Sequence, residues 1–257
     1  MYQQATAPQT IGGVLDSGFK LYRACFSKVF WLAAVAALIM TPVNLVGPYF
    51  QRNTPTLEAF AWVASGGLVV LALWGVTYGA LIARIDSVAR GVPLSVADAL
   101  AIGLRRLPAM FVSWLLAGCA IVVGLILVLI PGLIFIIWFV FAPTAVIIER
   151  VGPFDSLSYS RALVRGHWWR TAALLTIIGI VLTVVYVVLA MAIGIFFIAN
   201  PSAIAGGEAP WYLQLVLGPV FSAAVAPLWY ALLLSIYYDL KARLEGGDLA
   251  ARIAATA

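Results

Sequence analysis

The stretch from Leu107 to Ile148 reads LPAMFVSWLLAGCAIVVGLILVLIPGLIFIIWFVFAPTAVII and contains 42 residues without a charged side chain. A helix that crosses the hydrocarbon core of a bilayer needs about 20 apolar residues, so this stretch is too long for one span. The pair Pro131-Gly132, which is typical of turns, lies within it. We therefore expect two transmembrane helices here, over about 107–130 and 132–149.

A re-entrant hairpin is the alternative for the same residues, because only 16 residues separate Gly132 from Glu149. Such a hairpin would enter and leave the bilayer on one side, and its two ends would lie where the ends of two full spans lie. Two full spans are favoured because irregular backbone exposed to lipid is costly within the hydrocarbon. The sequence leaves the choice open.

The composition of the whole chain indicates a membrane protein. Of its 257 residues, 64% are hydrophobic and 10% are charged, with a mean hydropathy of +1.08. Soluble domains are about 45–50% apolar and about 25% charged. We expect an all-α fold, in which residues 1–257 form a single membrane domain: a polytopic integral membrane helical bundle with six transmembrane helices. The expected spans lie at about 29–49, 59–83, 107–130, 132–149, 171–198 and 211–238.

The distribution of basic residues predicts the orientation of this bundle. Fourteen of the 15 Lys and Arg residues lie before the first span, after the last one, or in the loops after spans two and four; only Arg52 lies on the other side. Short cytoplasmic loops carry an excess of Lys and Arg. We therefore expect a multi-pass protein with cytoplasmic N- and C-termini. Anionic headgroups explain the positive net charge, so nucleic acid is not an expected partner.

Three short amphipathic segments precede the odd-numbered spans, at about 10–27, 95–106 and 153–167. In the first, apolar residues recur every three or four positions on one face and charged residues line another, as in a helix at a membrane surface. In each segment an acidic residue comes early and basic residues come late, which the helix dipole favours. We expect interfacial helices on the cytoplasmic side.

The search for chemistry finds little. The apolar runs contain no Asp, Glu, Lys, Arg or His, the residue types that mark ion pathways in membranes. His167 is the only histidine, and Cys25 and Cys119 lie far apart in the chain. No catalytic or metal-binding motif is present. We expect no enzymatic activity, no cofactor and no metal.

Two sets of residues are candidates for a site. The first set would meet lipid headgroups at the cytoplasmic interface and consists of Lys20, Arg23, Arg105, Arg106, Arg161, Arg165, Trp168, Trp169 and Arg170. The second set would line a cavity, because proline breaks helical hydrogen bonding in the sixth span, and consists of Gly218, Pro219, Pro227 and Tyr230.

Three segments carry a resemblance to a known group. These are the opening from Ile11 to Arg23, the segment from Glu149 to Arg170, and the end from Tyr237 to Leu249. They resemble the bacterial glycerophosphoryl diester phosphodiesterase membrane domain family and its uncharacterised six-span relatives. The resemblance implies a membrane scaffold in the bacterial inner membrane. Because that group's phosphodiesterase chemistry resides in a separate soluble domain, it implies no catalytic residue here.

We expect a non-enzymatic inner-membrane protein that engages anionic lipid or a membrane partner and supports envelope lipid organisation. Membrane phospholipids are the expected partners, together with another membrane protein or a second copy of the chain. The alternative is a transporter, flippase or permease-like subunit for a lipid or apolar solute. An enzyme acting on lipid ranks third, because no nucleophile and base are recognisably paired. The ligand and the oligomeric state are not predicted.

Overall fold

The computed structural model describes residues 7–52, 56–127, 129–199 and 211–256, and within these ranges the chain is helical and contains no strand. Six helices are long and apolar enough to cross a membrane, so the chain is a multi-pass membrane protein. The predicted loop 200–210 lies outside the described residues. The helices are α1 (Ile11–Arg52), α2 (Leu57–Ala89), α3 (Val96–Leu127), α4 (Leu129–Phe139), α5 (Ala142–Ile148), α6 (Pro153–Val164), α7 (Trp168–Ala199) and α8 (Trp211–Thr256).

Two of the three predicted amphipathic segments are not separate helices. The first is the beginning of α1 and the second is the beginning of α3, each continuous with the span that follows. The apolar face of the first segment packs against protein: Val14 and Leu21 are buried, and Gly18 lies directly against Leu232 of α8. Amphipathic periodicity correctly marks a buried face, but it does not say whether lipid or another helix covers that face.

The long apolar stretch breaks close to the predicted turn. Helix α3 ends at Leu127 and α4 begins at Leu129, so Pro131 lies in the first turn of α4, where its missing N–H is not needed. Gly132 allows the two helices to approach closely, because a Cβ there would overlap Leu125. The predicted helix 132–149 is divided into α4 and α5. Alone, α4 rises only about 16 Å, half of the hydrocarbon thickness, and it reaches spanning length only together with α5.

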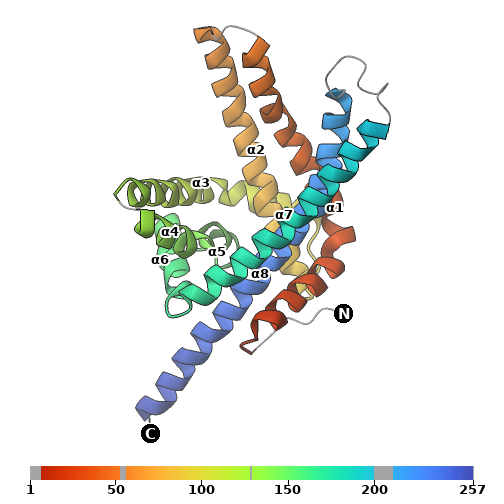
Figure 1. Ribbon diagram of the computed structural model, residues 1–257. Coiled ribbons are helices and arrows are strands. Elements are labelled where there is room, and N and C mark those ends of the chain that lie inside the picture. The colour runs from red at the N-terminus through yellow and green to blue at the C-terminus, as the bar shows by residue number, and fades with distance from the viewer. Residues whose placement is uncertain (1–6, 53–55, 128, 200–210, 257) are drawn as a thin grey trace.

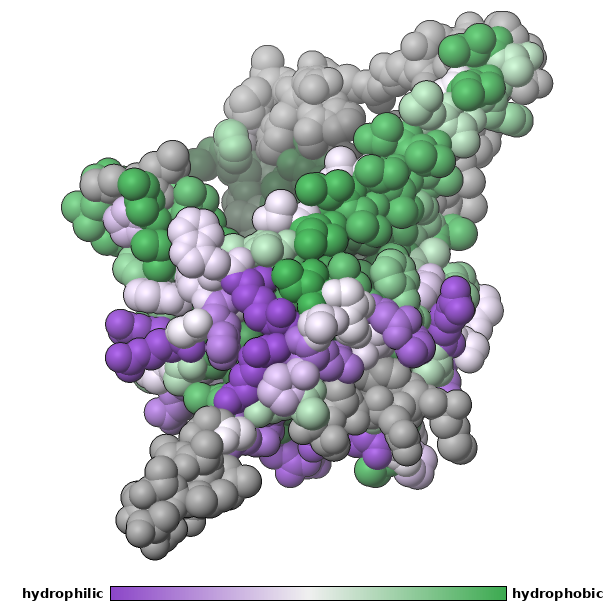
Figure 2. Space-filling view, turned by 60° about the horizontal axis from the view of Figure 1, so that its bottom comes forward, coloured by the Kyte–Doolittle hydropathy of each residue, from purple (hydrophilic) through white to green (hydrophobic). Residues whose placement is uncertain are grey.

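One end of the bundle carries many basic residues, and we call it the basic end because Lys28, Arg84, Arg170 and Lys241 lie there. Helices α1 and α8 pack against each other over the first part of α1 and separate toward the opposite end (Figure 1). The core consists mainly of the half of each helix that lies nearer this end. Figure 2 shows hydrophilic residues over this end and hydrophobic residues along the helices that rise from it.

The opposite end, which we call the far end, is open. The α1/α2, α3/α4 and α7/α8 pairs point away from the common core in different directions (Figure 1). Nearly all residues of α2 from Leu57 to Leu73 are exposed, and so are most described residues of α7 from Thr183 onward. Most of their side chains are apolar, so this half is suited to contact with lipid.

Candidate functional site

Asp239 is the centre of a polar network at the basic end. Its side chain is only 1% exposed, and its carboxylate accepts hydrogen bonds from the backbone N–H of Gln9 at 2.7 Å, from Arg170 at 3.0 Å and from Arg243 at 3.0 Å. Both guanidinium groups also donate to the carbonyl oxygen of Gln9, at 2.6 and 2.7 Å. This network joins the segment before α1, the start of α7 and the part of α8 from Asp239 to Arg243. A buried carboxylate is stable here because two cations and a backbone donor surround it.

Glu149 is the second acidic centre and follows the end of α5. Its Oε1 accepts hydrogen bonds from Lys241 at 2.6 Å and from Tyr237 at 2.7 Å. Burial opposes ionisation, but these two hydrogen bonds and the nearby positive charges outweigh it and hold the pKa of Glu149 below its ordinary value. The carboxylate therefore stays ionised and ties α5 to α8.

A third contact reaches α2. Tyr238 donates a hydrogen bond to Asp86 at 2.5 Å, and Asp86 also pairs with Arg90 at 2.9 Å. The five polar side chains of α8 from Tyr237 to Arg243 thus contact the ends of α2 and α5, the start of α7 and the segment before α1. We call this set, Tyr237, Tyr238, Asp239, Lys241 and Arg243, the C-terminal junction.

The structure divides the predicted headgroup residues into two groups. In the first group, Arg23, Arg105 and Arg165 are exposed and form no ion pair with any described residue, while the guanidinium of Arg161 lies 4.5 Å from the centre of the Trp138 ring. Trp169 belongs with them, because its side chain is 81% exposed. These five side chains extend from the basic end toward the surroundings.

The second group makes contacts within the protein. Arg170 belongs to the Asp239 network, and Arg106 donates a hydrogen bond to the carbonyl oxygen of Arg150 at 3.0 Å. Lys20 pairs with Asp16 at 2.6 Å on the surface of α1. Trp168 is partly buried against Trp169, with ring centres 4.7 Å apart. Their predicted headgroup contacts stay predictions, and the charge of Arg170 is already neutralised by Asp239.

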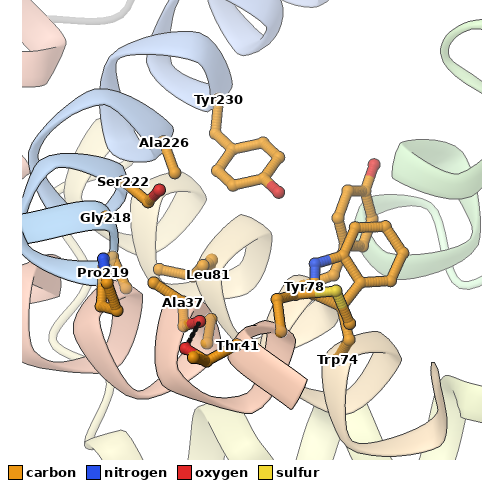
Figure 3. A pocket seen from close by; sticks show the side chains of 13 residues that line it. Ala37, Thr41, Trp74, Tyr78, Leu81, Gly218, Pro219, Ser222, Ala226 and Tyr230 are labelled. Atoms are coloured by element: carbon orange, nitrogen blue, oxygen red, sulfur yellow. Dashed lines mark hydrogen bonds between the residues drawn. The ribbon is translucent and has the colours of Figure 1, made fainter. Parts of the chain in front are cut away.

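A pocket of about 200 Å³ lies between α1, α2 and α8, within the apolar part of the bundle (Figure 3). Helix α1 contributes a narrow wall of small side chains, helix α2 contributes two aromatic rings, and α8 contributes the segment around its first proline. The pocket is lined by Ala33, Ala36, Ala37, Met40, Thr41, Trp74, Tyr78, Leu81, Gly218, Pro219, Ser222, Ala226 and Tyr230. No charged side chain is among them.

The structure places three of the four predicted cavity residues, Gly218, Pro219 and Tyr230, in the wall of this pocket. Pro227 is buried elsewhere in α8. Its ring cannot supply the N–H that would bond to the carbonyl of Ala223, and the next carbonyl, that of Ala224, accepts a hydrogen bond from Tyr22 at 3.1 Å. The second proline does not line the pocket.

Of the residues that hold the basic end together, Arg170 was predicted, as a headgroup contact, whereas Asp239 and Glu149 were not. Only their position in the segments that carry the family resemblance could have distinguished these two acidic residues. Among the described residues, no group of His, Cys, Asp and Glu is arranged to hold a metal ion.

Comparison with known proteins gives a family but no function. A family model described as a domain of unknown function, DUF7847, matches residues 28–240. The chain belongs to this family. No curated protein and no solved structure matches the chain. The matched DUF7847 region contains the whole pocket together with Glu149, Arg170 and Asp239.

Proposed function

We propose that this DUF7847 protein is a non-enzymatic protein of the bacterial inner membrane whose basic end faces the cytoplasm and binds anionic phospholipid headgroups. The observation that carries the proposal is the group of exposed side chains without an acidic partner among the described residues, namely Arg23, Arg105 and Arg165, next to Arg161 and Trp169. Each Lys or Arg close to an anionic membrane surface contributes about 1 kcal/mol of attraction. Supporting envelope lipid organisation is the role that such binding would serve.

The position of these side chains supports this reading. They lie on α1, on α3, on α6 and the residue after it, and at the start of α7, so they come from four parts of the chain. Tryptophan is enriched at the level of lipid headgroups, where Trp169 would place its exposed ring. The resemblance to the membrane domains of glycerophosphoryl diester phosphodiesterases belongs to the same proposal, because those domains are membrane scaffolds as well.

Spin-labelled lipids test the proposal. The protein is reconstituted in phosphatidylcholine with trace spin-labelled phosphatidylglycerol or phosphatidylcholine, and electron paramagnetic resonance measures the fraction of each that the protein immobilises. We expect a preference for phosphatidylglycerol that falls with added salt and is at least halved in the variant Arg161→Gln/Arg165→Gln. Glu58→Gln, at the far end, is the control and should leave the preference unchanged. Equal immobilisation of both lipids by the unaltered protein would refute the proposal.

A transporter or flippase-like role for a lipid or apolar solute is the second candidate, and the pocket favours it. Closely packed helices without an internal cavity would argue against transport. The pocket between α1, α2 and α8 is an internal cavity, so this objection does not apply. Transport predicts that reconstituted protein accelerates the movement of a fluorescent lipid between leaflets, measured by dithionite quenching. Movement no faster than in protein-free vesicles would remove this candidate.

A further inference from the structure

The pocket between α1, α2 and α8 contains polar groups that the protein itself does not satisfy. Tyr230 is 8% exposed, and its hydroxyl has no hydrogen-bond partner in the part of the chain that the structure describes. In Figure 3 this hydroxyl points into the space between the helices. The enclosed side-chain atoms without a partner among the described residues are Thr144 Oγ1 and Trp168 Nε1, so the Tyr230 hydroxyl is not enclosed but is accessible from the pocket, where a bound group can reach it. The unpaired Tyr230 hydroxyl therefore points to a ligand.

Two further polar groups line the pocket, although their side chains are only partly buried. Neither the hydroxyl of Ser222 nor the indole N–H of Trp74 bonds to any described residue. Tyr78 differs, because its ring lines the pocket but its hydroxyl points away from it in Figure 3. Thr41 differs as well, because its hydroxyl donates to the carbonyl of Ala37 at 3.2 Å. The pocket thus offers two hydroxyls and one N–H donor to a ligand.

The absence of charge among the lining residues excludes a class of ligands. A phosphate or carboxylate buried here would lose its hydration without meeting a cation, at a cost of several kcal/mol. An uncharged oxygen, such as that of an alcohol or an ester, could accept from Trp74 or exchange hydrogen bonds with Tyr230 and Ser222. The remaining lining residues, mostly alanine, leucine, methionine and aromatic side chains, suit an apolar chain.

The volume of the pocket and its depth in the membrane are consistent with binding part of a lipid. The wall of α1 begins at Ala33 and ends at Thr41, which places the pocket about 8 to 20 Å along the helix from Lys28 at the basic end. This depth lies inside a hydrocarbon core of about 30 Å. At about 30 Å³ for each water-sized group, the pocket volume of about 200 Å³ holds about seven such groups. That is an oxygen with a short piece of chain, and not a whole lipid.

We infer that this pocket binds an uncharged lipid by its hydroxyl or ester oxygen, with Tyr230 as the main hydrogen-bonding residue. The inference goes beyond the headgroup binding proposed above, because it concerns different residues, a different depth and a neutral ligand.

Photolabelling tests the inference. The protein is placed in phosphatidylcholine nanodiscs without anionic lipid, so that the result is independent of headgroup binding. Four diazirine probes with the same chain are compared: a long-chain alcohol, a methyl ester, a carboxylic acid and an alkane. We expect saturable labelling of pocket residues such as Met40 and Leu81, stronger for the alcohol or the ester than for the acid and the alkane. The stronger of the first two identifies the oxygen type.

Variants make the test specific. Tyr230→Phe removes only the hydroxyl and should weaken labelling by that probe roughly two- to tenfold, the range expected for one hydrogen bond. Ser222→Ala should weaken it less. Tyr186→Phe, on the exposed part of α7, is the control and should change nothing. Unaltered thermal unfolding shows that each variant is folded. Labelling that is not saturable, that prefers the alkane, or that is insensitive to both pocket variants would overturn the inference.

Discussion

The two halves of the bundle differ in how they hold their helices. The helices α8 and α2 illustrate the difference: in an apolar stretch of 18 residues, 61% of the residues of α8 are buried within the protein, whereas for α2 the share is 6%. The difference does not come from hydrophobicity, because lipid solvates an apolar helix as well as another helix does. At the basic end, close glycine contacts and the C-terminal junction bring the helices together, and at the far end such contacts are rare among the described residues. Helices in a membrane associate where small residues and polar groups allow it.

The largest expected effect comes from removing the centre of the C-terminal junction. Asp239→Asn leaves Arg170 and Arg243 facing each other without the carboxylate, and breaking a buried ion pair in this way costs about 3–5 kcal/mol. Unfolding by a graded detergent titration measures the change. Asp16→Asn is the matched control: Asp16 also pairs with a basic residue, Lys20, but on the surface, so we expect less than about 0.5 kcal/mol. Similar losses in both variants would show that the junction does not stabilise the basic end.

Alanine substitutions at two glycines, one at a helix crossing and one on an exposed part of α2, test the packing difference directly. A Cβ at Gly103 would overlap the carbonyl oxygen of Val76, and Gly103 lies where α2 and α3 cross. Gly103→Ala should therefore destabilise the protein by about 1–3 kcal/mol. Gly66 has no atom near its Cβ position, so Gly66→Ala should be neutral or slightly stabilising through helix propensity. The same unfolding titration compares the two variants, and a loss of stability at Gly66 equal to that at Gly103 would mean that the far end is packed.

Lowering the pH should reduce the stability of the basic end by less than the two substitutions above do. The pKa of Glu149 is lower in the folded protein than its ordinary value of 4.5, so its contribution to stability is complete above about pH 4.5 and is lost as the pH falls through the folded-state pKa. The difference in unfolding free energy between the unaltered protein and Glu149→Gln should therefore shrink as the pH is lowered from 6 to about 3. A difference that stays constant over this range would contradict the role of the ionised carboxylate.

The sequence predicts those features that depend on hydrophobicity and charge pattern. The helical membrane class and the count of six spanning helices follow from runs of uncharged residues, and both are confirmed. The break near Pro131 also follows from turn chemistry. The continuity of α1 and α3 was not predicted, because amphipathic periodicity is the same whether lipid or α8 covers the apolar face.

The residues of the candidate sites also differ in whether the sequence could predict them. Prolines in α8 directed attention to Gly218 and Pro219, which line the pocket, since a missing N–H disturbs a helix wherever it occurs in the sequence. Asp239 and Glu149 could not be selected, because their importance depends on contacts with Gln9, Arg170 and Lys241 that are far apart in the chain. Ser222 is one of several uncharged polar residues in the apolar runs, and nothing in the sequence separates it from the others; Trp74 had no local signal.

The central claim is that the closely packed basic end lies in the cytoplasm and the open end on the other side of the membrane. Cysteine labelling in intact cells and in inverted membrane vesicles tests it most directly. In a Cys119→Ala background, where Cys25 is buried, Ser158→Cys on α6 and Glu58→Cys at the start of α2 are treated with a membrane-impermeant maleimide. The account predicts that residue 158 is labelled only in inverted vesicles and residue 58 only in intact cells. Labelling of both positions from the same side, or of residue 158 from outside intact cells, would contradict it.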